Sequence, residues 1–170
     1  MEDQNKAWKT YEEVAAYLLN QLAEKFGIVR VEGKQTLKGQ KSGTDWEIDA
    51  KGVGSQNDIF LIIECRRYTS SKQSQEKLGA LAYRIHDTGA SGGIIVSPLG
   101  LQEGAEKVAK SENIHNVILN PDSTTTNYIL KFLNEVHVGI GEKVVGRASI
   151  SVTKIDKDGN VYETVTYDEA

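Results

Sequence analysis

The residues best suited to chemistry lie within residues 43–68, where two extended runs both carry acidic side chains. The first run reads GTDWEIDA and the second reads IFLIIECRRY, with a turn-rich segment, GVGSQND, close before the second. Because side chains alternate along a strand, Asp45, Glu47 and Asp49 are predicted to share one face. The second run is apolar until Glu64, which is typical of a strand buried on both faces.

The turn between the two runs predicts an antiparallel hairpin, which would bring Asp49 and Glu64 together with Arg66 beside them. Two carboxylates about 4 Å apart repel by several kcal/mol at the effective dielectric of a protein. Such a corner requires a divalent cation or a shared proton. The alternative is an ion-pair network, in which Glu64 pairs with Arg66 or Arg67 and Asp49 caps a turn. The cation site is favoured because apolar residues would often serve stability equally well at buried positions.

Composition limits the class of protein. The chain has 170 residues, 39% of them hydrophobic and 26% charged, which predicts one domain or one domain with an appendage. A single cysteine excludes an internal disulfide framework and favours a reducing compartment. No run approaches the ~20 apolar residues of a membrane span, and the N-terminus does not read as a signal peptide. We therefore expect a cytoplasmic protein that does not bind membranes.

Charge is unevenly distributed. The net charge of −4 argues against a protein coated in basic surface for nucleic acid. Residues 30–84, however, hold ten Lys or Arg against seven Asp or Glu, a net of +3, whereas the rest of the chain carries −7. A positive field around an acidic centre suits a phosphate-bearing polyanion. An uneven scatter of solvated charges explains the same count.

A helix is predicted over residues 7–26, because apolar residues recur there at three- and four-residue steps. Gly27 is a natural stop for this helix. Glu12 and Glu13 fall in its first turns, where acids stabilise the helix dipole. The alternative is that one of them faces the carboxylate corner.

The remaining pattern predicts a mixed α/β domain. A short strand at 28–32 and a polar loop at 33–44 precede the two acidic runs, and two further helices alternate with two further strands; these are expected at about 71–87 (helix), 92–97 (strand), 101–109 (helix) and 115–119 (strand). The order α-β-β-β-α-β-α-β predicts a three-layer α/β sandwich over a mixed sheet.

The character of the chain changes after residue 120. A short amphipathic helix is predicted over 128–136, followed by a hairpin in which runs 148–155 and 161–167 flank an Asp-Gly turn. We therefore expect a core of 1–120 and an extension of 121–170, packed on the core or used for assembly.

The motifs GTDWEID, IIECRRY and GGIIVSP, in this order between residues 11 and 120, resemble the PD-(D/E)XK nuclease superfamily. The similar branch is that of Mrr-like restriction endonucleases, where an Asp strand precedes a strand reading (E/Q)CKRY. The resemblance implies a restriction-endonuclease-like core and a metal-dependent DNA endonuclease. A catalytically impaired module that binds nucleic acid or a protein partner is the alternative.

The resemblance also implies roles for individual residues. Asp49 and Glu64 would bind Mg²⁺ or Mn²⁺, with the carbonyl of Cys65 as a third ligand. Glu12 resembles the carboxylate that some branches contribute from the first helix. Gln75 lies on the helix after the catalytic strand, where related enzymes often carry a polar site residue.

Arg66 stands where the family has a catalytic lysine. Arginine stays charged and binds oxyanions in a fork, so Arg66 could stabilise charge on a phosphate but could not act as a general base. Water activation would then depend on the metal. DNA is the expected partner, and cutting both strands would favour a homodimer.

Overall fold

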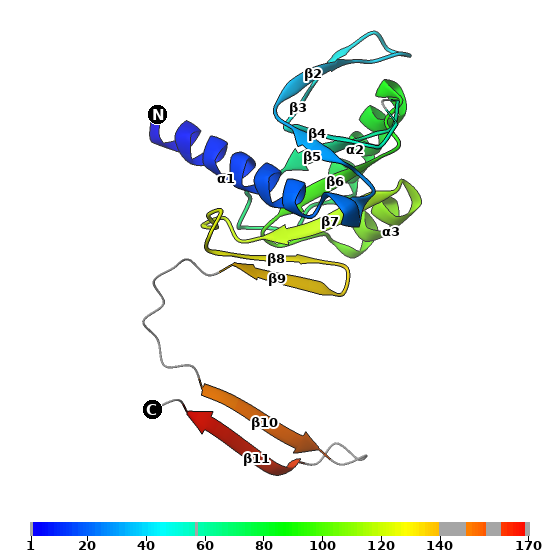
Figure 1. Ribbon diagram of the computed structural model, residues 1–170. Helices are drawn as coiled ribbons and strands as arrows, with labels where there is room; N and C mark the ends of the chain where they lie inside the picture. The colour runs from blue at the N-terminus through cyan, green and yellow to red at the C-terminus, as the bar shows by residue number, and fades with distance from the viewer. Residues whose placement is uncertain (1, 57, 140–148, 156–160, 169–170) are drawn as a thin grey trace. The chain divides into compact units, whose positions relative to one another are not determined.

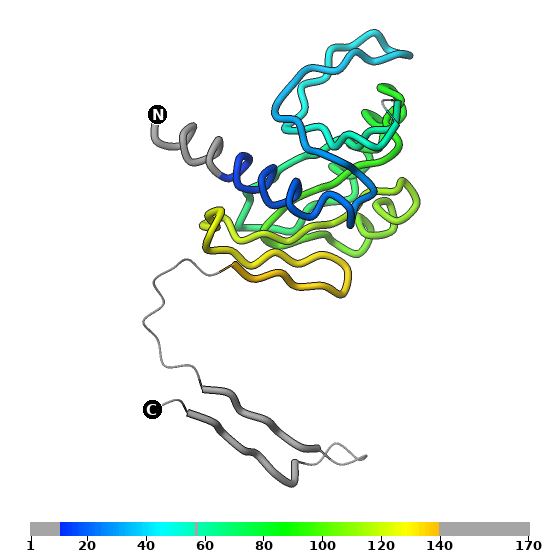
Figure 2. Tube along the Cα trace, in the orientation of Figure 1, coloured from blue at the N-terminus to red at the C-terminus, as the bar shows by residue number. Residues whose placement is uncertain are grey.

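The structure is a computed structural model that describes residues 2–56, 58–139, 149–155 and 161–168 (Figure 1). Side chains are described for residues 11–56 and 58–139 (Figure 2). The chain forms two compact units, residues 1–140 and residues 141–170. No helix in the described part of the chain is long and apolar enough to cross a membrane.

The first unit is built on a seven-stranded mixed sheet in the order β1-β4-β5-β6-β7-β8-β9. Strands β5, β6 and β7 are parallel, and the remaining neighbours are antiparallel. The elements are α1 (Glu2–Gln21), a 3₁₀ turn η1 (Ala23–Phe26), β1 (Arg30–Glu32), β2 (Gln35–Lys38), β3 (Asp45–Ile48), β4 (Ala50–Val53), β5 (Phe60–Cys65), α2 (Gln75–Thr88), β6 (Gly92–Ser97), α3 (Glu103–Ser111), β7 (Ile114–Leu119), β8 (Tyr128–Phe132) and β9 (Glu135–Gly139).

Helices cover both faces of this sheet, which confirms the predicted three-layer arrangement (Figure 1). Helix α1 packs on one face, where Ile63 and Cys65 of β5 point into its core. Helices α2 and α3 pack on the other face, where Ile62 of β5 points. This alternation along β5 places Glu64 on the α2 side.

Helix α1 begins at Glu2, five residues before the predicted start at residue 7. Glu12 and Glu13 therefore lie in the middle of the helix, and the proposal that they stabilise its first turn is wrong. The predicted apolar stripe is confirmed, because Tyr11, Ala15 and Leu18 are buried. Gly27 ends the segment in the left-handed conformation with φ 67°, as glycine without a Cβ readily does.

The predicted strand beginning at Asp45 is two strands. Strand β3 pairs with β2 in a separate two-stranded sheet, whereas β4 joins the main sheet. The loop predicted for 33–44 therefore contains a strand. Ile48 packs in the α2 side of the core and Ala50 in the α1 side, so the chain changes direction at the residue between them. That residue is Asp49.

The break separates Asp49 from the two acids that were expected to share its face. Asp45 and Glu47 are exposed and form surface ion pairs with Lys38 at 3.1 Å and Lys34 at 3.2 Å. Such exposed pairs contribute little to stability. Asp45 and Glu47 therefore lie on the β2–β3 hairpin, and of these three acids Asp49 is the one beside the core.

The helix predicted for residues 128–136 is wrong, because β8 and β9 form an antiparallel pair there. Leu130 and Phe132 are buried against the α1 side of the core while Ile129 and Lys131 are exposed, which is the period of a strand. Both strands belong to the seven-stranded sheet. In the second unit, β10 (Ser149–Ile155) and β11 (Val161–Asp168) pair antiparallel as predicted, and their Asp-Gly turn lies outside the described residues.

Candidate active site

The pairing of β4 with β5 brings the two predicted acids together. The antiparallel register ends at the pair Ala50–Ile63, and Asp49 and Glu64 each adjoin this pair along the chain. The backbone N–H of Cys65 donates a hydrogen bond of 2.7 Å to Oδ2 of Asp49. This bond fixes the Asp49 carboxylate against the end of β5.

Arg66 contacts every atom that was predicted to bind the metal. Its Nη1 donates to the carbonyl oxygen of Cys65 at 3.1 Å and lies 3.5 Å from Oδ2 of Asp49. Its Nη2 donates to Oε2 of Glu64. One guanidinium therefore joins the two carboxylates and the carbonyl, which places the predicted ligands around a single cation.

Arg84 of α2 is a site residue that the sequence analysis missed. Its Nη1 donates to Oε1 of Glu64, so Glu64 accepts one arginine on each oxygen. The Arg84 guanidinium also lies 5.2 Å from the ring centroid of Trp46, a favourable cation–π contact. The available signal was a charged residue beside Leu81 and Ile85 on the buried stripe of the helix.

A second chain of contacts anchors Trp46. Its indole Nε1 donates a hydrogen bond of 2.7 Å to Asp87, the buried acid near the end of α2. Asp87 also accepts from the backbone N–H groups of Lys41 and Ser42 in the β2–β3 loop. The hairpin is thereby joined to α2, and the Trp46 ring packs against the Arg84 guanidinium.

Glu64 is only 3% exposed. Burial raises the pKa of Glu64, opposed by Arg66 and Arg84, and the nearby Asp49 carboxylate raises it further. Glu12 of α1 belongs to the same electrostatic group. Burial raises the pKa of Glu12, and the Asp49 carboxylate adds to the rise. The structure thus brings Glu12 to the carboxylate corner.

Two hollows of opposite character lie at the site, one lined by Asp49 and the other by Glu64 and Arg66. One, of about 380 Å³, is lined by Glu12, Glu13, Ala16, Gly33, Lys34 and Asp49. The other, of about 230 Å³, is lined by Glu64, Arg66, Tyr68, Lys77, Ala80, Leu81, Arg84 and Ile95. The first is mainly acidic and the second mainly basic, so the site has a carboxylate side and a cation side.

Two other predicted site residues occupy different positions. Gln75 is exposed at the start of α2, where its Oε1 would lie 2.5 Å from a Cβ on Gly104 of α3. The thiol of Cys65 is buried in the α1 side of the core, where burial raises its pKa. The carbonyl of Cys65, and not its thiol, therefore belongs to the site.

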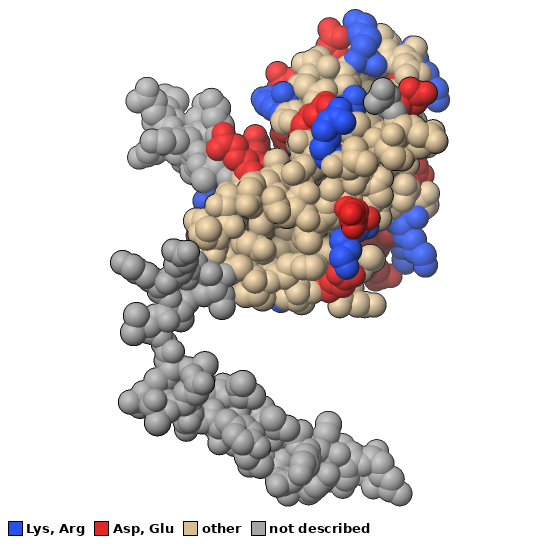
Figure 3. All heavy atoms as spheres, in the orientation of Figure 1, with Lys and Arg blue, Asp and Glu red and all other residues tan. Residues whose placement is uncertain are grey.

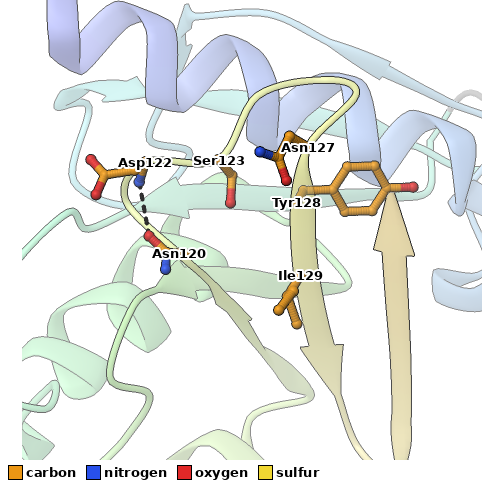
Figure 4. A pocket seen from close by; sticks show the side chains of 6 residues that line it. All are labelled: Asn120, Asp122, Ser123, Asn127, Tyr128 and Ile129. Atoms are coloured by element: carbon orange, nitrogen blue, oxygen red, sulfur yellow. Dashed lines mark hydrogen bonds between the residues drawn. The ribbon is translucent and has the colours of Figure 1, made fainter. Parts of the chain in front are cut away.

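A further hollow of about 200 Å³ lies at the connection between β7 and β8, lined by Asn120, Asp122, Ser123, Asn127, Tyr128 and Ile129 (Figure 4). Two hydrogen bonds serve the local turn: Oδ1 of Asn120 accepts the backbone N–H of Asp122, and the nearby Thr124 hydroxyl accepts that of Asn127. The buried hydroxyl oxygen of Ser123 has no hydrogen-bond partner among the described residues. None of the residues predicted for catalysis lines it. We assign it no chemistry.

The donor atoms of the corner are suited to a hard cation, because carboxylate and carbonyl oxygens are what Mg²⁺ and Mn²⁺ prefer. One guanidinium contacts all three groups, with Nη1 at Asp49 and the Cys65 carbonyl and Nη2 at Glu64. Among the residues whose side chains are described, no group of three or more His, Cys, Asp or Glu converges to hold a metal. A divalent cation would therefore rely on two carboxylates and the carbonyl.

Comparison with known proteins supports the assignment of the fold. A family model described as restriction endonuclease, of the Mrr catalytic type, matches residues 4–122, more than half of the chain. A crystal structure of a protein of unknown function superimposes with a TM-score of 0.50 at 17% identity, over 62% of this chain and 56% of that one. No curated protein matches the chain.

A second solved structure, a repair endonuclease from Pyrococcus abyssi, gives a TM-score of 0.38 at 19% identity over 65% of this chain and 47% of that one. The chain thus spans about half the length of each of these solved structures. The predicted restriction-endonuclease-like fold and the Mrr-like resemblance are confirmed.

Proposed function

Because the chain belongs to the Mrr-type restriction endonuclease family, we propose that it is an endonuclease that hydrolyses DNA phosphodiesters with a divalent cation, Mg²⁺ or Mn²⁺. The observation that carries the proposal is the convergence of Asp49, Glu64 and the Cys65 carbonyl on one cation position. Family membership supports a nuclease-type function, and the geometry supports this corner as the place of the reaction.

The proposed cation ligands are Oδ2 of Asp49, Oε2 of Glu64 and the carbonyl oxygen of Cys65. When bound, the cation would polarise the phosphate and lower the pKa of a water molecule. The protein's own part is to hold these oxygens in place. Arg84 does so for Glu64 by occupying its Oε1, and the Cys65 N–H does so for Asp49.

The two hollows differ in how well each would accept a DNA phosphate. The basic hollow offers Lys77 and Arg84 to a phosphate, whereas Glu12 and Glu13 on the opposite side repel one. Figure 3 shows that acidic and basic side chains interleave over the β2–β3 hairpin, so this view of the hairpin presents no basic patch. We therefore propose that the DNA backbone enters from the α2 side.

Glu12 is proposed to add to the negative charge of the carboxylate side, which favours a cation there. Gln75 is proposed, from its position at the start of α2, to contact DNA outside the reacting group. A homodimer would supply the second site that a double-strand break needs. Since Cys65 is a free thiol, a reducing compartment such as the cytoplasm suits the enzyme.

The proposal is tested by nicking of supercoiled plasmid with Mg²⁺ or Mn²⁺, with and without chelator. We expect Asp49→Asn to lower the rate at least 100-fold and Asp45→Asn, which removes an exposed acid paired with Lys38, to leave it unchanged. Full activity of the Asp49 variant, or cleavage that persists in chelator, would refute the metal-site assignment.

A second candidate function follows from Arg66, which replaces the family's lysine and closes the carboxylate corner. In this case the domain binds DNA or a protein partner without cutting. Salt-dependent DNA binding by a wild-type protein that does not nick plasmid, and whose Arg66→Lys variant does not nick either, would favour this function.

A further inference from the structure

Arg66 occupies the position that the proposed cation requires. Its guanidinium contacts Asp49, Glu64 and the Cys65 carbonyl, and these are the same three groups that would bind the metal. Glu64 has no second oxygen to offer, because Arg84 holds Oε1. A metal ion bound to these three oxygens would therefore compete with the Arg66 guanidinium for the same position.

Electrostatic repulsion leads to the same conclusion. Two cations within a few Å of one another repel strongly where burial lowers the effective dielectric. Glu64 is 3% exposed, so this repulsion is poorly screened. Entry of a divalent cation therefore favours displacement of one of the two guanidinium groups that Glu64 holds.

We infer that Arg66 is an exchangeable internal cation: it neutralises Asp49 and Glu64 in the metal-free protein, and a divalent cation displaces it toward the basic hollow beside α2. The inference rests on the proposed function, and it adds a control on metal binding to it. Arg66 lines that hollow already, so its displaced side chain would be available to a phosphate there.

The surroundings of the two arginines explain why Arg66 is the one that moves. Arg84 extends from a helix and lies against Trp46, which Asp87 anchors. Arg66 follows the last residue of β5 and has a side chain 31% exposed. Among the described residues, the polar contacts that release of Arg66 breaks are those to the oxygens that the metal then takes.

Displacement of Arg66 should weaken the apparent affinity for the metal. When a binding-competent state is only a fraction of the population, the apparent dissociation constant rises by the inverse of that fraction. Removing the Arg66 guanidinium should therefore tighten metal binding. Because Arg67 pairs with Asp122, at 3.8 Å, and not with the carboxylate corner, it provides a matched control.

The first experiment measures Mn²⁺ binding to the full chain by calorimetry. We expect Arg66→Met to lower the Kd at least tenfold and Arg67→Met to leave it unchanged. Arg66→Met combined with Asp49→Asn should lose the gain. Equal Kd values for the wild type and Arg66→Met would overturn the exchange.

The second experiment follows the arginine side chains of the wild-type protein by NMR during a Mg²⁺ titration, so it does not depend on how a variant folds. The Nε–H signal of Arg66 should move toward that of a free arginine while that of Arg84 stays in place. Saturation with Mg²⁺ without a change at Arg66 would overturn the exchange.

These outcomes separate the inference from the proposed function. If Mg²⁺ binds and plasmid is cut while the Arg66 Nε–H signal does not change, the proposed function is supported and the exchange is refuted. If neither the wild type nor Arg66→Met binds Mn²⁺ and no cleavage occurs, both fall.

Discussion

Replacement of the whole ion cluster tests whether the chain keeps it for chemistry or for stability. The cluster consists of Glu64, Arg66 and Arg84, and it lies beside apolar side chains of the α2 core such as Ile62 and Ile95. The decisive variant changes all three residues at once, Glu64→Leu with Arg66→Met and Arg84→Met. It is compared with the single variant Arg84→Met.

The expected changes in the free energy of unfolding differ between the single and the triple variant. Removing one partner of a buried ion pair costs roughly 3–5 kcal/mol, because it leaves a buried charge uncompensated. Arg84 is 25% exposed and Glu64 keeps Arg66, so the low end, about 3 kcal/mol, applies to Arg84→Met, with about 1 kcal/mol more for its contact with Trp46. The triple variant removes Glu64 together with both of its arginines. Among the described residues, only Asp49 loses an ion pair, and its side chain is 17% exposed and keeps the Cys65 N–H, so the triple variant should lie within about 1 kcal/mol of the wild type.

Urea unfolding followed by tryptophan fluorescence measures both values, with equal m-values as the check that the unfolded states are comparable. Arg30→Met, which breaks an exposed pair with Glu32, is the control and should change the free energy of unfolding by less than about 1 kcal/mol. A triple variant destabilised as much as Arg84→Met would show that the cluster stabilises the fold, and the argument for a chemical role would fail.

Three further predictions concern the fold around the site. Hydrogen bonds from the Ser42 hydroxyl and the Trp46 indole hold the pKa of Asp87 below its usual range. The stabilisation from the ionised Asp87 is present above about pH 3.9 and lost as the pH falls through the folded pKa. The loss of unfolding free energy in Asp87→Asn should therefore shrink in acid, and a loss independent of pH would contradict the prediction. Gly92→Ala would place a Cβ 2.4 Å from the backbone oxygen of Asn113 in the turn before β7, costing about 1–3 kcal/mol by chemical unfolding. Tyr11→Phe removes the hydrogen bond of 3.1 Å to Leu119, costing about 1 kcal/mol in the same assay, and no change would mean that the bond is not formed in solution.

The meeting of Asp49 and Glu64 could be predicted because it depends on local rules. A turn between two strand-like runs fixes an antiparallel pair, and the pair fixes which residues lie opposite. The break at Asp49 could not be predicted, because strands β3 and β4 are continuous in the sequence pattern. Only the competition between the β2–β3 pair and the main sheet ends the first strand at Ile48.

Arg84 was missed for a different reason. A helix residue at the edge of a buried stripe can point to the core or to solvent, and the packing of α2 against the sheet and α3 decides between them. Likewise, the run from Tyr128 to Val136 is so short that its apolar residues fit both the helical and the strand period. The free edge of β7 decides that case, since β8 satisfies its backbone hydrogen bonds.

The two arginines of the site carry the same charge but differ in what supports them, and this difference follows from the fold. Arg84 is held by a helix and by Trp46, which is itself held through Asp87, so its contact with Glu64 persists whatever binds at Oε2. Arg66 is held by Asp49, Glu64 and the carbonyl of Cys65. Because a divalent cation would take these same oxygens, metal binding removes the contacts that keep Arg66 in place and leaves those of Arg84 intact. Position in the fold, more than residue type, therefore makes one arginine a positioning residue and the other an exchangeable cation.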